Sequence, residues 1–151
     1  MLLRPYQPQD LQLLLHIWLE AVRATHTFLQ EEDVQYFYPL VRDEYLPALE
    51  VWVAEAEDNS AVGFIGLDGA KVEMLFIDPQ QHGRGVGRQL LAHASQAKGS
   101  LTVDVNEQNE GAYQFYKKCG FAETGRSELD SFGKPYPIIH LASTIYTLSN
   151  S

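Results

Sequence analysis

Apolar residues recur at helical spacing near the start of the chain. After Pro8 and Asp10, which are typical of a helix start, they occupy positions three and four apart. These positions are Leu11, Leu14, Leu15, Trp18, Leu19 and Val22. The pattern predicts a first helix from residue 11, and a weaker one predicts a second helix over Val34–Tyr45, ending before Pro47 because the residue ahead of a proline disfavours helix.

Short runs of β-branched and aromatic residues alternate with further helical stretches. A polar turn at 57–60 separates two such runs and predicts an antiparallel hairpin. A later helix is predicted to end at Lys98-Gly99, where a basic last turn precedes a glycine. The order of elements predicts an α/β fold. The expected strands are 2–4, 51–55, 62–67, 71–77, 101–105 and 138–142, and the expected later helices are 86–98 and 109–118.

Composition favours one soluble globular domain over 1–151. Hydrophobic residues make up 45% and charged residues 21% of the 151 positions, a balance typical of globular proteins. No repeat or linker divides the chain. No apolar run approaches the roughly 20 residues of a membrane span, so we expect no membrane association.

Targeting and metal signals are also missing from the sequence. The first residues lack the basic region and apolar core of a secretory signal, which predicts a cytoplasmic protein. Cys119 is the single cysteine and five histidines are scattered, so neither a disulfide nor a structural metal is expected. We interpret Cys119 as a packing residue, because no neighbouring pattern supplies the base that a nucleophilic cysteine needs.

Charge is distributed unevenly along the chain. The formal net charge is −9, and residues 1–79 hold four Lys/Arg against fourteen Asp/Glu. From Pro79 to Val103 there is no acidic residue, while Arg84, Arg88 and Lys98 are basic. The basic window favours an anionic ligand there. A nucleic-acid partner is not expected, because binding to phosphate backbones needs a broad basic face.

Three glycines at alternate positions follow the strand predicted at 71–77. Gly83, Gly85 and Gly87 lie around the start of the helix predicted from 86, whose first amides lack intrahelical partners and can bind an anion. A Walker loop would need Gly-Lys-Ser/Thr, and a dinucleotide fingerprint would need G-x-G-x-x-G. The loop lacks the Gly-Lys-Ser/Thr of the first pattern, and its G-x-G-x-G spacing differs from that of the second. A purely structural glycine turn is the remaining alternative.

Two segments together resemble the GCN5-related N-acetyltransferase (GNAT) family. The family's loop, Arg/Gln-x-x-Gly-x-Gly/Ala, aligns with 82–87, where His82 replaces the usual Arg or Gln. A second family pattern, N-x-x-A-x-x-F-Y-x-K-x-G-F, matches 109–121. Further likeness to small bacterial members at 24–26, 105–110, 125–128 and 133–137 extends the resemblance over nearly the whole chain.

The resemblance implies a fold and a cosubstrate. We expect a mixed, mostly antiparallel sheet, splayed between its fourth and fifth strands and flanked by helices. Acetyl-CoA would lie in the splay, with its pyrophosphate on the glycine loop and its pantetheine arm along the fourth strand. The implied binding residues are Leu75, Phe76, Ile77, His82, Gly83, Arg84, Gly85, Val86, Gly87, Arg88, Asn106, Asn109, Tyr113 and Tyr116.

Two residues are candidates for the chemistry of direct acetyl transfer to an amine. Tyr116 matches the tyrosine that many family members place beside the coenzyme sulfur, where it would assist the departing thiolate. The alternative is ordinary helix packing with Phe115. Glu73 is the candidate base, because a lysine-like amine with a pKa near 10.4 is almost fully protonated at pH 7. The alternative for Glu73 is a solvated residue on the sheet surface.

His26, Phe28 and Trp52 belong to an aromatic-rich set that could line an acceptor pocket, although such clusters are more often core. The acidic first half predicts a basic amine acceptor, which is either a small cationic amine or a lysine or N-terminus of a protein. His140, on the last expected strand, is an alternative candidate base, but a lone histidine in an apolar run is more often a hydrogen-bonded core residue, and we interpret it so. A coenzyme A sensor without turnover is the rival function, and the family resemblance leaves a homodimer open.

Overall fold

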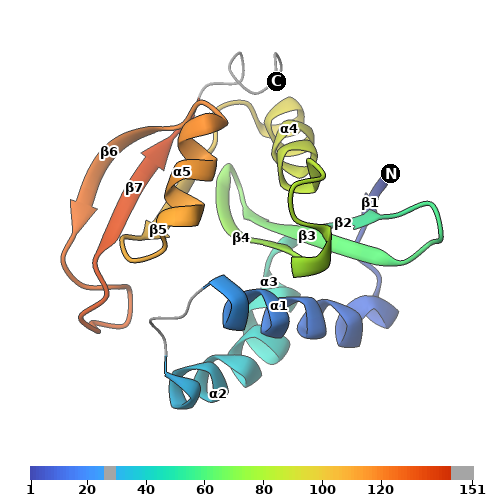
Figure 1. Cartoon of the computed structure of the whole chain (residues 1–151), viewed down its shortest axis with the longest axis horizontal. Helices are drawn as coiled ribbons and strands as arrows, with labels where there is room; N and C mark the ends of the chain where they lie inside the picture. The colour runs from blue at the N-terminus through green and yellow to red at the C-terminus, as the bar shows by residue number, and fades with distance from the viewer. Residues whose placement is uncertain (26–29, 144–151) are drawn as a thin grey trace.

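The computed structural model describes residues 1–25 and 30–143, and within these ranges seven strands form one sheet in the order β1-β2-β3-β4-β5-β7-β6. Figure 1 shows this sheet running through the molecule, with helices on either side. The strands are β1 (Leu2–Pro5), β2 (Glu50–Glu55), β3 (Ala61–Asp68), β4 (Lys71–Ile77), β5 (Thr102–Asn106), β6 (Ala122–Ser127) and β7 (Ile138–Ala142).

Strand pairing is antiparallel except between β4 and β5, which run parallel. These two strands pair at only two positions, Lys71 with Thr102 and Val72 with Val103. Beyond Val72 they separate, so that the edge of β4 over residues 73–77 has no strand partner on the β5 side among the described residues. The predicted splay between the fourth and fifth strands is confirmed.

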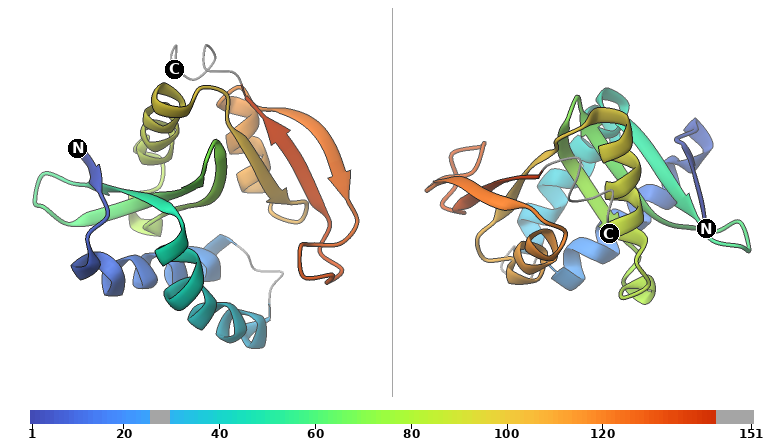
Figure 2. Two further views of the ribbon diagram at one scale, coloured as in Figure 1. Left: turned by 180° about the vertical axis from the view of Figure 1, so that it is seen from behind. Right: turned by 90° about the horizontal axis from the view of Figure 1, so that it is seen from above.

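Helices cover both faces of the sheet, as the two views of Figure 2 show. Residues of α4 and α5 share one hydrophobic core with β3, β4 and β5, and residues of α1 and α2 share a second core with β2 and β3. No helix of the described residues is long and apolar enough to cross a membrane. The helices are α1 (Leu11–Thr25), α2 (Glu31–Leu40), α3 (Leu46–Ala48), α4 (Val86–Lys98) and α5 (Glu110–Lys118), with a π-helical turn at Val41–Tyr45 and 3-10 turns at Pro8–Asp10 and Pro79–Gln81.

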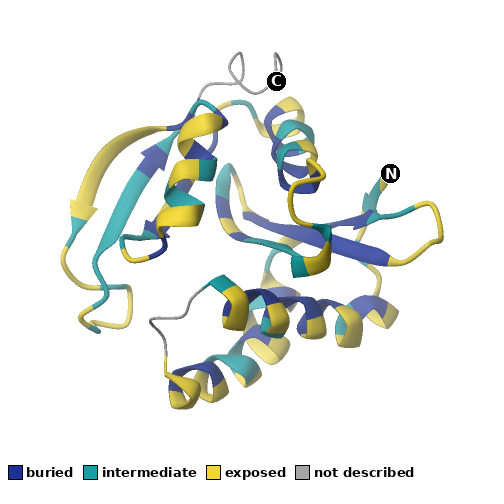
Figure 3. Cartoon of the chain, viewed as in Figure 1, coloured by how far each residue is buried: buried dark blue, intermediate teal, exposed yellow. Residues whose placement is uncertain are grey.

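The helix predicted from residue 11 has the buried stripe that its spacing requires (Figure 3). The second helical stretch was predicted to end before Pro47, and this boundary is wrong. The backbone stays helical through Val41–Tyr45 into α3, where Pro47 lies in the first turn. The π-helical turn just before this proline, in which the Leu46 amide donates to the Val41 carbonyl, departs from regular α-helical hydrogen bonding.

One strand, β6, was not predicted from the sequence. Its burial pattern is exposed at five consecutive positions, Ala122–Arg126, and only Ser127 is half-buried. An edge strand of this kind lacks the alternation of apolar and polar residues that identifies a strand. It forms because its backbone pairs with β7 along Ala122–Ser127.

Candidate functional site

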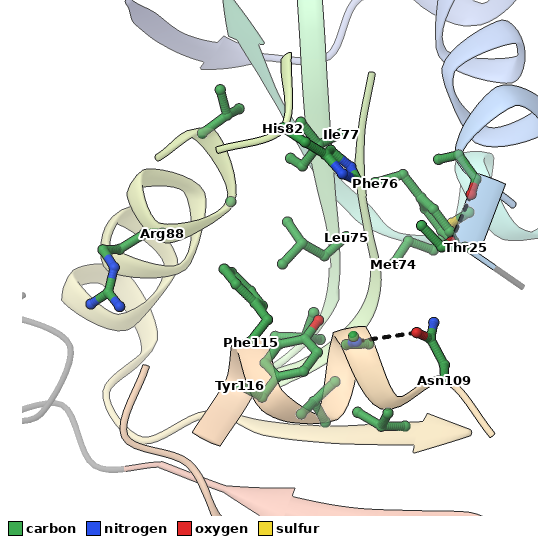
Figure 4. A pocket seen from close by; sticks show the side chains of 18 of the residues that line it. Thr25, Met74, Leu75, Phe76, Ile77, His82, Arg88, Asn109, Phe115 and Tyr116 are labelled. Carbon is green, nitrogen blue, oxygen red and sulfur yellow. Dashed lines mark hydrogen bonds between the residues drawn. The ribbon is translucent and has the colours of Figure 1, made fainter. Parts of the chain in front are cut away.

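A cleft of about 860 Å³ opens where β4 and β5 separate. It reaches from the glycine turn and α5 on one side of the sheet to the end of α1 on the other. Figure 4 shows Arg88, Phe115 and Tyr116 on the first side and Thr25 across the strand β4. The cleft therefore connects the two faces of the sheet where β4 and β5 separate.

The glycine turn forms one mouth of this cleft. Gly83 and Gly85 line it with φ of +81° and +78°, in the left-handed region that other residues rarely adopt. Gly85 is the N-cap of α4, so the first amides of that helix face this mouth without intrahelical partners. An added Cβ at either glycine would meet nothing within 4 Å. The requirement for glycine here is one of backbone conformation, as expected of an anion-binding turn.

Gly87 has a different role, because it lies inside α4 and faces α5. An added Cβ would lie 3.0 Å from Cζ of Phe115. The missing side chain therefore lets the Phe115 ring pack against α4, where it forms part of the cleft wall. Arg88, on the next position, also lines the cleft and adds a positive charge near the turn.

The strand β4 supplies the long wall of the cleft through Leu75, Phe76 and Ile77. The register between β3 and β4 shifts opposite Glu73, which is an extra residue in β4. As a result Val72 packs into the core under α4 and α5, while Met74 packs into the core under α1. Among the described residues, the main chain that follows this bulge is not paired with β5, and an extended ligand with amide groups can bind along this edge.

Tyr116 lies at the buried centre of the cleft, on the inner face of α5. Tyr116 is only 6% exposed, and its ring packs edge-on against the rings of Phe115 and Phe121. Figure 4 shows the hydroxyl pointing away from α5 toward β4. Burial raises the pKa of this phenol well above its usual range, and the nearby Cys119 adds to the shift. Tyr116 is therefore a hydrogen-bond donor throughout the physiological pH range.

Glu73 and Asp104 line the cleft on the side of the sheet that faces α1. Lys71 lies between them, with its Nζ 3.1 Å from Glu73 Oε1 and 3.1 Å from Asp104 Oδ2. Partial burial would raise the pKa of Asp104, but hydrogen bonds from His140 and Lys71 outweigh it and hold that pKa below its usual value. Ala21, Ala24 and Thr25 of α1 complete this second mouth. A small, negatively charged opening of this kind suits a cationic group.

Two asparagines predicted to contact the cosubstrate line the cleft at the start of α5. The side-chain oxygen of Asn109 accepts a hydrogen bond from the amide of Ala112 at 3.1 Å and so caps α5. The side-chain oxygen of Asn106 accepts from the amide of Gln108 at 3.1 Å. Both residues thus shape the loop that leads from β5 into α5.

Some of the predicted residues lie elsewhere. Arg84 lies outside the cleft, beside a smaller hollow near the β2–β3 hairpin. The Tyr113 hydroxyl donates a hydrogen bond to the carboxylate of Glu123. The Trp52 ring packs at 4.4 Å from that of His93 on α4, on the face of the sheet opposite α1. We therefore leave Trp52 out of the acceptor site. His26 and Phe28 lie outside the described residues.

Several residues that line the cleft, among them Phe115 and Asp104, were not predicted from the sequence. Phe115 was noted only as a packing neighbour of Tyr116. A signal existed for Asp104, because it alternates with the buried Val103 and Val105 and so had to face the other side of β5. His140 was interpreted as a hydrogen-bonded core residue. Its hydrogen bonding is confirmed, with Asp104 and Ser127 as partners, but its side chain is 35% exposed, so its placement in the core was wrong.

The described residues fit acetyl-CoA. The turn at Gly83 and Gly85 offers helix amides to a diphosphate, and the edge of β4 beyond its pairing with β5 offers main-chain groups to an extended amide-containing arm. His82 and Val86 also line this side, so His82 occupies the place predicted for it at the turn. Within residues 1–25 and 30–143, no group of three or more His, Cys, Asp or Glu is placed to hold a metal ion.

Comparison with known proteins gives a consistent assignment. Residues 47–123 match the acetyltransferase (GNAT) domain family. The chain is 50% identical over 129 residues to the peptidyl-lysine N-acetyltransferase YjaB of Escherichia coli strain K12, covering 85% of this chain and 87% of that protein. It is 43% identical over 139 residues to YjaB of Salmonella typhimurium strain LT2, covering 92% and 95%.

A solved structure supports the same assignment. The solution structure of apo-form YjaB from Escherichia coli superposes with a TM-score of 0.86 at 47% identity, covering 93% of this chain and 95% of that one. The sequence motifs, the splayed sheet and these relatives agree, and the family predicted from the motifs is confirmed. This chain belongs to the GNAT family and is an acetyl-CoA-dependent N-acetyltransferase.

Proposed function

We propose that this enzyme acetylates the side-chain amine of lysine residues in proteins. The proposal is carried by the cleft that crosses the sheet, with an anion-binding turn at one mouth and two carboxylates at the other. The relatives that are 50% and 43% identical to this chain are peptidyl-lysine N-acetyltransferases. A lysine side chain is long and thin enough to enter from the α1 side and meet the cosubstrate inside the sheet.

The first mouth would hold acetyl-CoA, which supplies the activated acetyl group when bound. The amides at the start of α4 would donate to its diphosphate, and Arg88 would add charge-assisted stabilisation. The main chain at Leu75–Ile77 would pair with the amides of its pantetheine arm, as an added strand does at a sheet edge. One well-aimed amide in this segment would also stabilise the oxyanion, a contribution of about 2.7–4 kcal/mol in other enzymes.

Tyr116 would assist by donating a hydrogen bond to the leaving sulfur. An ordinary tyrosine has a pKa near 10 and a thiol near 8.5, so proton transfer to the thiolate would be uphill by about 2 kcal/mol. Burial raises the pKa of Tyr116 further, which makes the full transfer less favourable still. Stabilisation of the departing thiolate by a hydrogen bond is therefore the role that its environment supports.

The second mouth would select a cationic acceptor. Glu73 and Asp104 carry two negative charges, and Lys71 neutralises one of them. The surrounding first half of the chain is strongly acidic, since residues 1–79 carry fourteen Asp/Glu and four Lys/Arg. This charge raises the local concentration of cationic amines at the second mouth. We expect Glu73 to contact the incoming amine.

An acceptor survey tests the proposal. Purified enzyme would be incubated with acetyl-CoA and a lysine peptide, a polyamine or a neutral aromatic amine, with thiol release measured continuously and acetylated products identified by mass spectrometry. We expect the highest kcat/KM for the lysine peptide and a rise in its KM in Glu73→Gln. Glu57→Gln, a charge change on the distant β2–β3 turn, is the matched control.

Two outcomes would contradict the proposal. A preference for the neutral amine would refute the cationic acceptor. Coenzyme A binding by calorimetry without thiol release for any acceptor would favour a sensor instead.

A further inference from the structure

Lys71 lies at the point where β4 and β5 separate. It pairs with Thr102 in the short parallel ladder of the two strands. Its Nζ lies 3.1 Å from Glu73 Oε1 on its own strand and 3.1 Å from Asp104 Oδ2 on β5. The Lys71 ammonium therefore bridges the two strands where they part, and it joins the two carboxylates that line the second mouth of the cleft.

These contacts hold both carboxylates in place. Asp104 alternates with buried residues of β5, so its side chain leaves the strand on the face opposite α4 and α5. Its Oδ1 lies 2.6 Å from His140 Nδ1, and its Oδ2 contacts Lys71. Glu73 is the extra residue of the β4 bulge, and Lys71 ties it to the neighbouring strand. The ammonium thus keeps two like charges side by side, which would otherwise repel each other.

The bridge also fixes the charge of its members. Partial burial by itself would lower the pKa of Lys71, but hydrogen bonds to Glu73 and Asp104 outweigh it and raise that pKa. Partial burial would raise the pKa of Asp104, but hydrogen bonds from His140 and Lys71 hold it below its usual value. Lys71 therefore keeps its positive charge through the pH range in which the enzyme would be assayed.

We infer that Lys71 is a positioning residue for acetyl transfer: it holds Glu73 and Asp104 at the second mouth, and its charge favours the neutral, nucleophilic form of the acceptor amine. The inference rests on the proposed acetylation of lysine. An acceptor ammonium in contact with Glu73 would have the Lys71 ammonium as a close neighbour, because both bind the same carboxylate. Two like charges so close favour loss of a proton from one of them, and a neighbouring cation is one way in which enzymes activate an amine.

The acceptor amine is the member of this pair that loses the proton. Lys71 contacts two carboxylates, whereas the acceptor would contact Glu73 while its nitrogen faces the cosubstrate. The side chains of Lys71 and Glu73 are 42% and 36% exposed, so water reaches the mouth. One N–H bond of the acceptor ammonium breaks, its proton passes to this water, and the electron pair stays on nitrogen for attack on the acetyl carbon.

Other titratable groups of the described residues surround the bridge. Asp68 on β3 is opposite the lysine in the β3–β4 register, and His140 on β7 lies beside Asp104. Burial raises the pKa of Tyr45 in the π-helical turn, and nearby negative charge, that of Glu73 included, adds to the shift. These groups are unchanged in the variants described next, so a change in pH dependence reports the charge of the bridging ammonium.

The kinetics of Lys71→Met and Lys71→Arg with a lysine peptide, measured between about pH 6 and about pH 10, test this inference. We expect Lys71→Met to lower kcat about tenfold at pH 7, because the pH at which the bound amine loses its proton rises by about one unit, an effect expected of one charge a few ångströms away. The loss should vanish toward about pH 10, where lysine deprotonates unaided. The KM of the peptide should fall, since both carboxylates become free to bind it. Lys71→Arg keeps the charge and should restore most of kcat at pH 7.

Lys98→Met is the matched control. Lys98 also forms an ion pair, with Nζ 2.8 Å from Glu50 Oε1, and it does not line the cleft. Its replacement removes the same charge and should leave kcat, KM and the pH profile unchanged. Coenzyme A affinity, measured by calorimetry, should be unchanged in all three variants.

A second readout does not depend on turnover. In the NMR spectrum of the ligand-free protein, the Asp104 carboxyl should titrate at higher pH in Lys71→Met than in the wild type, and Lys71→Arg should reverse that change. Wild-type kcat and pH profile in Lys71→Met would overturn the inference. A rise in kcat at pH 7 would overturn it as well, because Lys71 would then only block Glu73. If the wild type acetylates a different amine, the lysine proposal fails alone, and the same variants are compared on that amine.

Discussion

Replacing Gly85 with alanine isolates the contribution of the turn's backbone conformation to coenzyme A binding. Gly85 has φ of +78° and ψ of 13°, and an added Cβ would meet nothing within 4 Å. The strain is therefore confined to the backbone. A left-handed conformation costs an alanine about 1–2 kcal/mol, and the smaller freedom of alanine in the unfolded chain offsets about 0.4–1 kcal/mol of it. We expect a net loss of about 1 kcal/mol in the free energy of unfolding.

The same strain should weaken binding. If the alanine turn relaxes to a more common conformation in the free protein, restoring the anion-binding shape costs up to about 1.4 kcal/mol, which corresponds to as much as a tenfold rise in Kd. Calorimetric titration with coenzyme A measures the affinity, and urea unfolding measures the stability.

Gly69→Ala is the matched control for this variant. Gly69 has φ of +58° with open space around an added Cβ, and it lies in the β3–β4 turn, outside the cleft. It should lose comparable stability with an unchanged Kd. A Gly85→Ala protein that is destabilised to the same extent, yet binds coenzyme A within twofold of the wild type, would refute the role assigned to the turn.

Three other substitutions have defined outcomes. Tyr116→Phe should lower kcat at least tenfold without changing coenzyme A affinity or Tm, and unchanged kcat would exclude a role in thiolate departure. Gly87→Ala should gain about 1 kcal/mol of helix propensity but displace Phe115, which lies 3.0 Å from the new Cβ. We expect weaker coenzyme A binding at unchanged Tm. Unchanged binding would contradict the assignment of Phe115 to the cleft wall. Asp10→Asn should lower the free energy of unfolding by about 2 kcal/mol at pH 7, because the buried Asp10 carboxylate accepts two hydrogen bonds of 2.8 Å from Arg4. Those bonds hold the pKa of Asp10 below its usual 3.8 despite burial. The stability that they add is present above pH 3.8 and lost as pH falls below it, so urea unfolding should show the two proteins converging at low pH.

Local signals in the sequence predicted much of the fold. The first helix, the β2–β3 hairpin and α4 follow from hydrophobic spacing and turn residues over fewer than twenty positions. The glycine turn and the N-cap of α5 at Asn109 are also local, because a cap acts on amides two or three residues away. The boundary at Pro47 was wrong because the helical turn that precedes it continues into α3.

Other features depended on contacts between distant residues. β6 is exposed along most of its length and is held by pairing with β7. Trp52 carries no local signal of which face of the sheet it occupies, and the structure packs it against His93. The tendency of aromatic rings to be buried predicts that Trp52 is covered, but it does not predict which helix covers it. The assembled sheet determines that helix.

The amino-acid sequence by itself determined the family, the cosubstrate and the position of Tyr116 on α5, because each is encoded in a short run of residues. Only the tertiary structure decided at which position β4 and β5 separate, after two paired positions, and that Asp104, His140 and Ser127 meet. The last contacts join residues 36 and 13 positions apart. The physical reason is that strand pairing and its register depend on how whole faces of the sheet are buried, which no local pattern specifies.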